Sequence, residues 1–328
     1  MRVVECIRYG PPEHLQIVER PDPPAGPGQV VVDVAFAAIN FPDVLIIANQ
    51  YQVSVPLPFV PGSEFSGTVA AIGDGVQGLT VGDRVFGSTM SGAFADAVVV
   101  PARSLRRLPE GVSLEVAAGF WVAHATAYHA LRSIAEVARG ETVVVLGAAG
   151  GVGLAAVELA VHLGCTVIAV ASTDEKLELC RRQGAAATIN YTSRPLRDAL
   201  REVAPKGVDV VIDPVGGAEA EKALRALRWK GRFVTVGFAS GEIPRIPLNL
   251  VLLKGCVIKG FEIRTFAQVE PDLAARDEGE LIELLASGRL RPHVSAVHDL
   301  ADAATALRTV AARRATGKLL LRAASAGG

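Results

Sequence analysis

Residues 143–154 read VVVLGAAGGVGL, and this stretch decides the fold. Four apolar residues in succession are typical of a strand that is buried on both faces of a parallel sheet. The alanines and glycines that follow form a tight turn whose backbone can approach a ligand, and Gly153 allows the next helix to pack closely on the strand. Free N–H groups and the positive dipole end of that helix favour a phosphate. The stretch therefore predicts a strand, turn and helix that bind the pyrophosphate of a dinucleotide.

The glycines of this turn, Gly147, Gly150, Gly151 and Gly153, depart from the strict Gly-x-Gly-x-x-Gly spacing but keep its late glycines. Glycine-rich turns also occur where two elements simply pack tightly, so the turn alone leaves that alternative open. Its context favours a nucleotide site, because a second apolar run, Val167–Ala171, ends at the distance where the adenosine ribose of a dinucleotide lies.

From residue 142 onward, apolar runs alternate with helical stretches. The runs are Thr142–Leu146, Val167–Ala171, Thr188–Asn190, Val208–Asp213 and Arg232–Val236. Such alternation predicts an α/β domain in which helices cover both faces of a doubly wound parallel sheet.

The chain before this region has a different residue composition. Residues 2–109 are dense in Pro and Gly, which separate short β-rich runs such as Val30–Phe36 and Ala97–Val100. After the α/β region follow a strand-like run at Cys256–Ile263, helical stretches at Glu278–Ser287 and Ala301–Ala312, and a terminal run at Lys318–Arg322. We assign the tail after residue 263 to the N-terminal, mostly β domain.

The composition limits the kind of protein. With 328 residues, of which 50% are hydrophobic and 20% charged, the chain can bury the cores of two domains. Its 33 Lys and Arg balance 34 Asp and Glu, so it lacks the basic surface that binds nucleic acid or an anionic membrane. We therefore expect neither kind of partner.

Cysteine usage and the start of the chain favour a cytoplasmic protein. Cys6, Cys165, Cys180 and Cys256 lie far apart and form no Cys-x-x-Cys pair, which predicts neither a disulfide framework nor a compact zinc lobe. The start, Met1-Arg2-Val3-Val4-Glu5, reaches a charge before the apolar region of a signal peptide can form. Glu158 and His162 interrupt the most apolar stretch, Ala148–Ala171, before it could span a membrane.

The end of the second apolar run bears on the choice of cofactor. An acidic residue there would bind the ribose 2′-hydroxyl of NAD and repel a 2′-phosphate, but this chain has Ala171, Ser172 and Thr173. Lys176 follows where its ammonium group can reach a phosphate. These residues favour NADPH over NADH, and the alternative is that Lys176 is an ordinary solvated helix residue.

Seven motifs occur in an order typical of one family. They are NFPD at 40–43, PGSEFSGTV at 61–69, VGDRV at 81–85, GAFAD at 92–96, TAYHAL at 126–131, AAGGVG at 148–153 and INY at 189–191. The chain resembles the medium-chain dehydrogenase/reductase superfamily over nearly its whole length, and most closely the zinc-independent, zeta-crystallin-like branch of NADPH:quinone oxidoreductases. The resemblance implies a GroES-like catalytic domain at 1–121 and 264–328 and a Rossmann NADPH-binding domain at 122–263.

Residue chemistry argues against a metal. The zinc enzymes of this superfamily use a Cys in the first motif and a His beside the Glu of the second, where this chain has Asn40 and Ser63. Residues 84–94 contain no Cys for a structural zinc loop. We interpret His124 and His129, which lie among apolar helix residues, as ordinary core or surface histidines, and we predict no metal site.

Without a Lewis acid, the acceptor must need little activation, and quinones meet that requirement. The resemblance implies three catalytic residues: Asn40 beside the nicotinamide and the acceptor, Asp43 in support of that loop, and Tyr51 with a hydroxyl near the acceptor. The residues themselves leave simpler alternatives open, since Asn40 can cap a turn, Asp43 can cap a helix and Tyr51 can merely pack.

The resemblance also assigns cofactor contacts. They are Asn40, Thr126, Ala149, Gly150, Gly151, Val152, Ser172, Lys176, Tyr191, Val215, Gly216 and Phe238. We expect Asp213 to end a strand rather than to catalyse. Ile47 and Asn49 stand where many quinone reductases carry an Arg and a Gly, which leaves the identity of the acceptor open.

Three functions follow from these observations. The leading hypothesis is an NADPH-dependent, zinc-independent reductase of quinones or related conjugated carbonyls. The second is a 2-enoyl-thioester reductase of the enoyl-CoA type, with Tyr51 as proton donor, and the third is a nucleotide-binding protein without turnover. By analogy with the family we expect a homodimer, formed by edge strands near Cys256–Ile263 that join the two cofactor-domain sheets.

Overall fold

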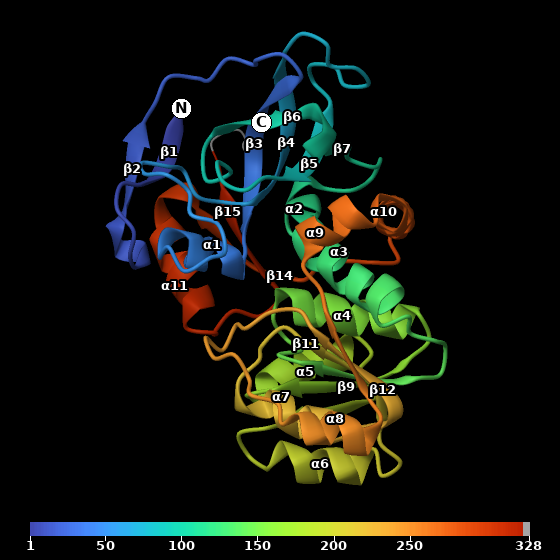
Figure 1. Cartoon of the computed structure of the whole chain (residues 1–328). Helices are drawn as coiled ribbons and strands as arrows, with labels where there is room; N and C mark the ends of the chain where they lie inside the picture. The colour runs from blue at the N-terminus through green and yellow to red at the C-terminus, as the bar shows by residue number, and fades with distance from the viewer. Residues whose placement is uncertain (324–328) are drawn as a thin grey trace. The chain divides into compact units, whose positions relative to one another are not determined.

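The computed structural model describes residues 1–323, and the chain divides into two compact units (Figure 1). Unit 1 combines residues 1–122 with the chain from Arg291 on, and unit 2 comprises residues 123–290. The predicted pair of a mostly β domain and a doubly wound parallel-sheet domain is confirmed. No described helix is long and apolar enough to cross a membrane.

Unit 2 alternates strands and helices. Its elements are α3 (Trp121–His129, which begins in the last two residues of unit 1), the π-helix η3 (Ala130–Ile134), β8 (Thr142–Leu146), α4 (Gly151–His162), β9 (Thr166–Ala171), α5 (Asp174–Arg182), β10 (Ala187–Asn190), α6 (Leu196–Val203), β11 (Val208–Asp213), α7 (Ala218–Leu224), β12 (Leu227–Thr235), α8 (Leu248–Lys254), β13 (Val257–Gly260), α9 (Ile263–Val269) and α10 (Pro271–Ala286).

The six strands of unit 2 are all parallel and lie in the order β10-β9-β8-β11-β12-β13. In order along the chain this is 3-2-1-4-5-6, the order of a Rossmann sheet, which binds dinucleotides beyond the carboxyl ends of its strands where the order reverses. The reversal lies between β8 and β11, whose central residues are fully buried because helices cover both faces. Figure 1 shows α4 and α6 on opposite sides of the strands.

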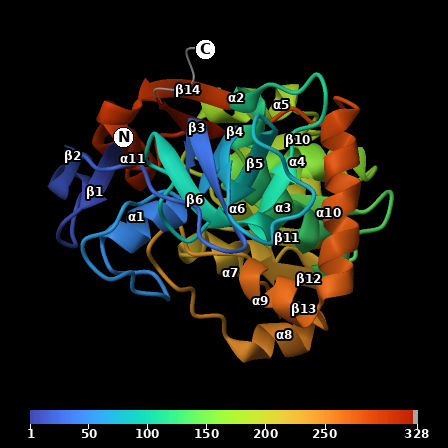
Figure 2. The same ribbon diagram turned by 90° about the horizontal axis from the view of Figure 1, so that it is seen from above.

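The chain between 264 and 290 belongs to unit 2, whereas the expected boundary followed residue 263. The reason is α10, which is longer than the predicted 278–287 and lies beside α3 (Figure 2). The Nδ1 atom of buried His129 lies 2.9 Å from Asp277 Oδ2, and the Tyr128 hydroxyl donates to Glu280 at 2.5 Å. These polar contacts join α10 to α3.

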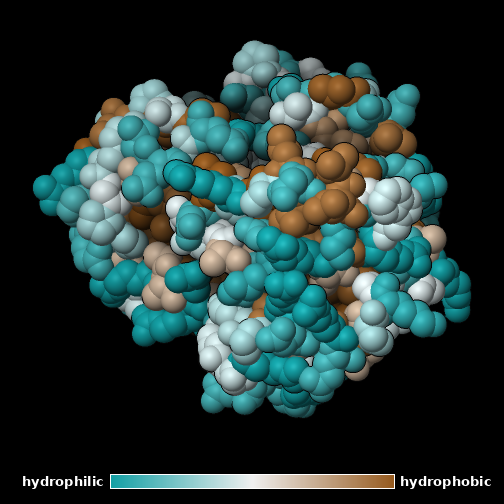
Figure 3. Space-filling model, turned by 60° about the horizontal axis from the view of Figure 1, so that its bottom comes forward, coloured by the Kyte–Doolittle hydropathy of each residue, from teal (hydrophilic) through white to brown (hydrophobic). Residues whose placement is uncertain are grey.

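One part of the unit 2 surface is apolar. Large hydrophobic side chains are exposed on α8, on β12 and β13, and in the loop before α8; they are Trp229, Ile243, Leu248, Leu252, Leu253, Val257 and Ile258. We call this set the apolar patch. Hydrophobic side chains gather in the view of Figure 3, which brings forward the side that carries α6 and α8 in Figure 1.

Unit 1 is mostly β. Its elements are β1 (Arg2–Cys6), η1 (Pro12–His14), β2 (Leu15–Glu19), β3 (Gln29–Ile39), α1 (Phe41–Ile47), β4 (Glu64–Ile72), β5 (Arg84–Ser88), β6 (Ala97–Pro101), η2 (Ala102–Ser104), β7 (Leu105–Arg107), α2 (Leu114–Ala118), β14 (Val294–Asp299), η4 (Leu300–Asp302), α11 (Ala303–Ala311) and β15 (Lys318–Arg322).

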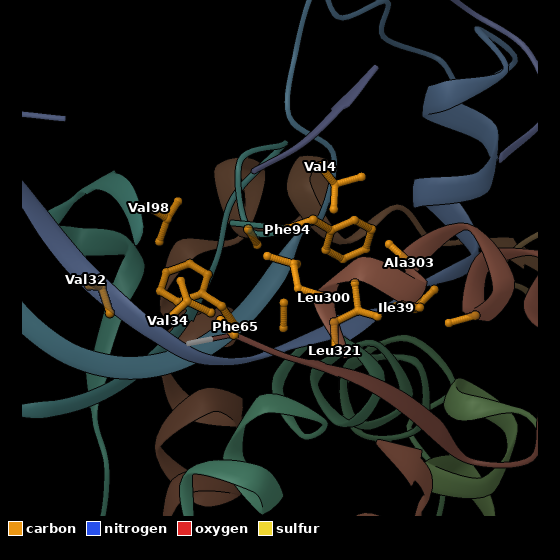
Figure 4. Packing of buried hydrophobic residues seen from close by; sticks show 14 of the residues in the cluster. Val4, Val32, Val34, Ile39, Phe65, Phe94, Val98, Leu300, Ala303 and Leu321 are labelled. Atoms are coloured by element: carbon orange, nitrogen blue, oxygen red, sulfur yellow. The ribbon is translucent and has the colours of Figure 1, made fainter. Parts of the chain in front are cut away.

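The main sheet of unit 1 has the order β14-β15-β3-β4-β5-β7, with β6 also paired to β3. The late strand β15 pairs antiparallel with β3, so that Leu320 lies opposite Ala38. Figure 4 shows Phe65 and Phe94 packed with valines of β3 and with Leu300 and Leu321 from the end of the chain. Each fully buried side chain of this size contributes about 1.5–3 kcal/mol, so the C-terminal segment is an integral part of the unit 1 core.

Candidate active site

The glycine turn after β8 forms an open cradle at the start of α4. Gly147 has a positive φ of 57°, and a Cβ atom on Gly153 would lie 2.2 Å from the Gly147 carbonyl oxygen. Only glycine therefore permits this approach of helix and strand. The N-cap of α4 is Gly150, which has no side chain to accept the first helical N–H groups. Those groups can bind a phosphate, so the turn fits a dinucleotide.

The expected 2′-phosphate residues gather beyond the ends of β9 and β10. Lys176 Nζ lies 3.4 Å from Ser172 Oγ, because Thr173 caps α5 and places Lys176 in its first turn. The Tyr191 backbone N–H donates to the Ala171 carbonyl at 3.2 Å, which brings the residue after β10 to the end of β9. Ser172, Lys176 and Tyr191 are thus neighbours at one corner of the sheet.

Val215, Gly216 and Phe238 lie in the loops that follow β11 and β12. A Cβ atom on Gly147 would lie 2.5 Å from Val215 Cγ2, and one on Gly216 would lie 2.8 Å from Phe238 Cδ1. These contacts place the loop after β11 next to the glycine turn, and the loop after β12 next to the loop after β11, at the carboxyl edge of the sheet. Ala149, Gly150, Gly151 and Val152 form the turn itself, and Thr126 is buried on α3.

Asp213 ends β11, as expected, and it also fixes the loop behind it. Its Oδ1 atom accepts hydrogen bonds from the backbone N–H groups of Val215 and Gly216, both at 2.8 Å. Burial raises the pKa of this carboxyl, and the two backbone hydrogen bonds partly offset that effect. The sequence showed only that Asp213 is an acidic residue at a strand end. Its hydrogen bonds to two consecutive backbone N–H groups could not be predicted, because they depend on the loop conformation.

In unit 1, Asn40 and Asp43 lie at the N-terminus of α1. Asn40 is the N-cap residue, and its backbone N–H donates to Asp43 Oδ2 at 2.7 Å. Asn40 thus stands at the N-cap position, and the Asp43 carboxylate binds the backbone N–H there. Asp43 is completely buried, and loss of solvation raises its pKa to about 7 despite the hydrogen bond from Asn40. Its other oxygen, Oδ1, has no hydrogen-bond partner among residues 1–323.

The Asn40 side chain lies in a buried polar cluster that also contains Ser63, Glu64 and Lys318. Lys318 Nζ donates to Asn40 Oδ1 at 2.6 Å and to Glu64 Oε2 at 2.8 Å. Asn40 Nδ2 donates to Glu64 Oε2 at 3.1 Å and to Ser63 Oγ at 3.4 Å. Glu64 Oε1 accepts from the Val122 backbone N–H at 2.8 Å.

Sequence reasoning did not single out Glu64 or Lys318. Glu64 stands inside a quoted motif, and Lys318 opens the apolar run KLLLR of β15. A lysine at the start of a strand that is otherwise buried was the available signal, since a buried ammonium needs a paired partner. Its partners are 278 and 254 residues away in sequence, beyond the reach of local patterns.

The donor set of this cluster does not fit a divalent cation. Asn40 and Ser63 are weak ligands, and the Lys318 ammonium already occupies the space beside Asn40 and Glu64. Among residues 1–323 there is no group of three or more His, Cys, Asp or Glu that could hold a metal. The helix histidines pair with carboxylates instead: His124 Nε2 lies 3.0 Å from Glu158 Oε2, and His129 meets Asp277.

Tyr51 and the two departures from the quinone reductase pattern lie on and after α1. Tyr51 is partly buried and packs on the hydrophobic core of unit 1. Ile47 is a core residue, which explains why an apolar side chain suits this position. Asn49 has a positive φ of 55°, a conformation natural for Gly and tolerated by Asn, so the change from Gly preserves the backbone.

A Rossmann sheet with an open glycine turn, joined to a GroES-like unit that carries a buried polar cluster, defines a class of oxidoreductases that use a nicotinamide cofactor. Models of two families match the chain: "Alcohol dehydrogenase GroES-like domain" over residues 26–110 and "Zinc-binding dehydrogenase" over residues 151–277. The chain belongs to the medium-chain dehydrogenase/reductase superfamily.

Individual relatives agree with this assignment. The chain is 39% identical over 322 residues to Quinone oxidoreductase-like protein 2 of Rattus norvegicus, covering 98% of this chain and 91% of the relative. Escherichia coli quinone oxidoreductase, solved in complex with NADPH, has a TM-score of 0.91 and 30% identity, covering 98% of this chain and 100% of the other. The Thermus thermophilus quinone oxidoreductase has a TM-score of 0.85 and 34% identity, with coverage of 98% and 100%.

Proposed function

We propose that this protein is an NADPH-dependent, zinc-independent reductase of quinones or related conjugated carbonyls. The observation that carries the proposal is the corner beyond β9, where Ser172 and Lys176 stand in place of the acidic residue that would select NAD. Two solved relatives of the same fold are quinone oxidoreductases described with NADPH. The donor set around Asn40 supports a reaction without zinc.

When bound, the nicotinamide would supply the hydride, and the protein would align the reactants and exclude water. The N–H groups at the start of α4 would bind the pyrophosphate, while Ser172, Lys176 and Tyr191 would bind the 2′-phosphate. Asp213 holds the loop that contains Val215 and Gly216, two residues that would contact the cofactor. The family resemblance would give Asn40 the place beside the reacting atoms and Asp43 the support of its loop, and a proton would reach the reduced acceptor from solvent or from a hydroxyl such as that of Tyr51.

The test measures loss of NADPH absorbance with quinones, enones and enoyl-CoA esters, repeated with NADH and with a chelator. We expect turnover of quinones or enones with NADPH that survives chelation. Turnover restricted to enoyl esters would replace the proposal with the 2-enoyl-thioester reductase, and cofactor binding without any turnover would replace it with a non-catalytic nucleotide-binding protein. Activity lost with the chelator and restored by zinc would refute the metal-free mechanism.

A single substitution tests whether Lys176 selects NADPH over NADH. Lys176→Ala is expected to weaken NADPH binding about tenfold, the usual scale for loss of one charged hydrogen bond, and to leave NADH binding unchanged. Lys206→Ala, which removes an exposed lysine from a turn of the same unit, is the matched control. Equal effects of Lys176→Ala on both cofactors would contradict the role of Lys176.

For the assembly, we propose a homodimer through the free edge of the unit 2 sheet. β13 is the last strand of that sheet, and the apolar patch surrounds it. An exposed strand edge with hydrophobic neighbours favours pairing with a second strand, and a second copy of β13 provides one. Light scattering is expected to give twice the chain mass, and Leu252→Glu with Val257→Lys should yield a monomer. A monomeric wild-type protein would refute the dimer.

A further inference from the structure

Lys318 is a buried lysine whose surroundings are unusual. Its side chain is 4% exposed, and its ammonium is bound by one carboxylate, Glu64, and one neutral amide, Asn40. A buried ammonium is stable only when it is paired and hydrogen-bonded, and Glu64 alone would satisfy the charge. The shorter of its two contacts nevertheless goes to the amide, at 2.6 Å against 2.8 Å.

The two charges fix one orientation of the Asn40 amide. An amide oxygen accepts hydrogen bonds and an amide nitrogen donates them, so Oδ1 must face the ammonium and Nδ2 must face the carboxylate. If the amide were rotated by 180°, its Nδ2 donor would face the Lys318 ammonium donor, and its Oδ1 acceptor would face the Glu64 carboxylate acceptor. Lys318 and Glu64 therefore aim the Nδ2 group of Asn40 in a single direction.

One of the two Nδ2 hydrogens is weakly held. The bond to Glu64 Oε2 is 3.1 Å long, while the contact with Ser63 Oγ is 3.4 Å, the longest in the cluster. Ser63 is also only partly buried, whereas Glu64 and Lys318 are buried. The hydrogen that faces Ser63 is therefore the one that an incoming oxygen atom can take over.

We propose that Lys318 is a positioning residue that turns Asn40 into the hydrogen-bond donor for the carbonyl oxygen of the acceptor. The ammonium on Oδ1 withdraws electron density from the amide and strengthens its N–H as a donor, because hydrogen bonds in a chain polarise one another. This inference rests on the proposed function, and it names the residue pair that stabilises the charge formed there.

The chemistry needs such a donor. An acceptor that receives a hydride, with its electron pair, gains a negative charge on its carbonyl oxygen, and a proton from solvent then neutralises that oxygen. A fixed donor aimed at the oxygen lowers the energy of the charged state without reorganisation during the reaction. Lys318 acts only through its contacts with Asn40 and Glu64 and takes no part in the proton transfer.

The experiment uses a charge-neutral variant. Lys318→Met alone leaves Glu64 as an unpaired buried carboxylate and can prevent folding, so Glu64→Gln/Lys318→Met is the main variant. We expect its kcat for a quinone or enone to fall about tenfold or more, while its Kd for NADPH changes less than about twofold. Lys259→Met is the control, since Lys259 also binds a carbonyl, Ile134 O at 2.6 Å, and a carboxylate, outside the cluster.

Two readouts separate positioning from a merely structural role. Because Lys318 acts through Asn40, adding Glu64→Gln/Lys318→Met to Asn40→Ala should lower kcat no further than Asn40→Ala alone does. Two results would overturn the proposal: effects on kcat that multiply in the combined variant, or a folded charge-neutral variant with the kcat of the wild type. By NMR, the side-chain amide protons of Asn40 should be protected from exchange in the wild type and unprotected in the variant. This readout needs no turnover, so unchanged protection refutes the positioning role, whereas an inactive wild type refutes the proposed function.

Discussion

Replacing Asp43 by Asn is expected to remove a pH dependence from the stability of unit 1. Asp43 is fully buried, and desolvation raises its pKa from 3.8 to about 7. The charged groups that face it are Lys318, which lowers the pKa, and Glu64, which raises it. A raised pKa means that the folded state holds the proton more tightly than the unfolded state, so this carboxyl stabilises the fold below pH 4 and loses that effect as the pH rises to 7.

The magnitude follows from the size of the shift. A change of about 3 pKa units corresponds to about 4 kcal/mol, since each unit corresponds to about 1.4 kcal/mol. Relative to Asp43→Asn, the wild-type protein should therefore lose about 1.4 kcal/mol of unfolding free energy per pH unit between pH 4 and 7, and then reach a plateau.

The chain offers a clean probe for this measurement. It has two tryptophans, of which Trp121 is buried in unit 1 and Trp229 is exposed in unit 2. In a Trp229→Phe background, the fluorescence of Trp121 reports urea unfolding at its contacts with Phe86 and Arg106 of unit 1. Other titrating groups cancel when the Asp43→Asn variant is compared with its parent protein. A difference that stays constant from pH 4 to 8 would show that burial does not penalise this carboxylate.

Three further predictions concern unit 2. Gly153→Ala should weaken NADPH binding at least tenfold, because its Cβ would meet the Gly147 backbone oxygen at 2.2 Å, whereas Gly279→Ala in α10 has open space and should bind normally; equal affinities in titrations would contradict the cradle. Asp213→Ala frees two backbone N–H groups and should weaken NADPH binding about tenfold with unchanged circular dichroism, and unaltered affinity would argue against its hold on the loop. Burial raises the pKa of Asp277, but hydrogen bonds from a histidine, a serine and an arginine outweigh this and lower it, so the carboxylate stabilises the fold above pH 4 and less in acid. Asp277→Asn should therefore lower the melting temperature at pH 7, by an amount that shrinks below pH 4; a pH-independent loss would count against the charge.

The sequence was a good guide to the parallel sheet. The strands at Thr142–Leu146 and Val208–Asp213 occur with the predicted bounds, because a run of buried apolar residues between helices is a local signal. The run predicted to begin at Arg232 starts at Leu227 instead. The first residues of β12 are mostly polar and exposed, so their sequence does not indicate a strand. They still belong to the β11–β12 pair, which contains a register shift between Val208 and Val210.

The site was harder to predict because its contacts span the whole chain. Asn40 and Ser172 could be named from motifs, since short segments place them at a helix start and a strand end. Lys318 could not, because its role depends on β15 pairing with β3 and on two partners near the beginning of the chain. The extent of α10 and its place in unit 2 likewise depend on tertiary contacts with α3.

The path of the chain through unit 1 also sets an order of events during synthesis. Unit 2 is continuous, so all of its strands have emerged from the ribosome while residues 36–39 of β3 still lack their partner β15. Domains generally fold as units as they are made, and an unpaired strand edge invites pairing with other chains. During synthesis the Rossmann unit is therefore complete before Lys318 has been translated. When β15 pairs with β3, the same step completes the sheet of unit 1 and brings Lys318 to Asn40 and Glu64.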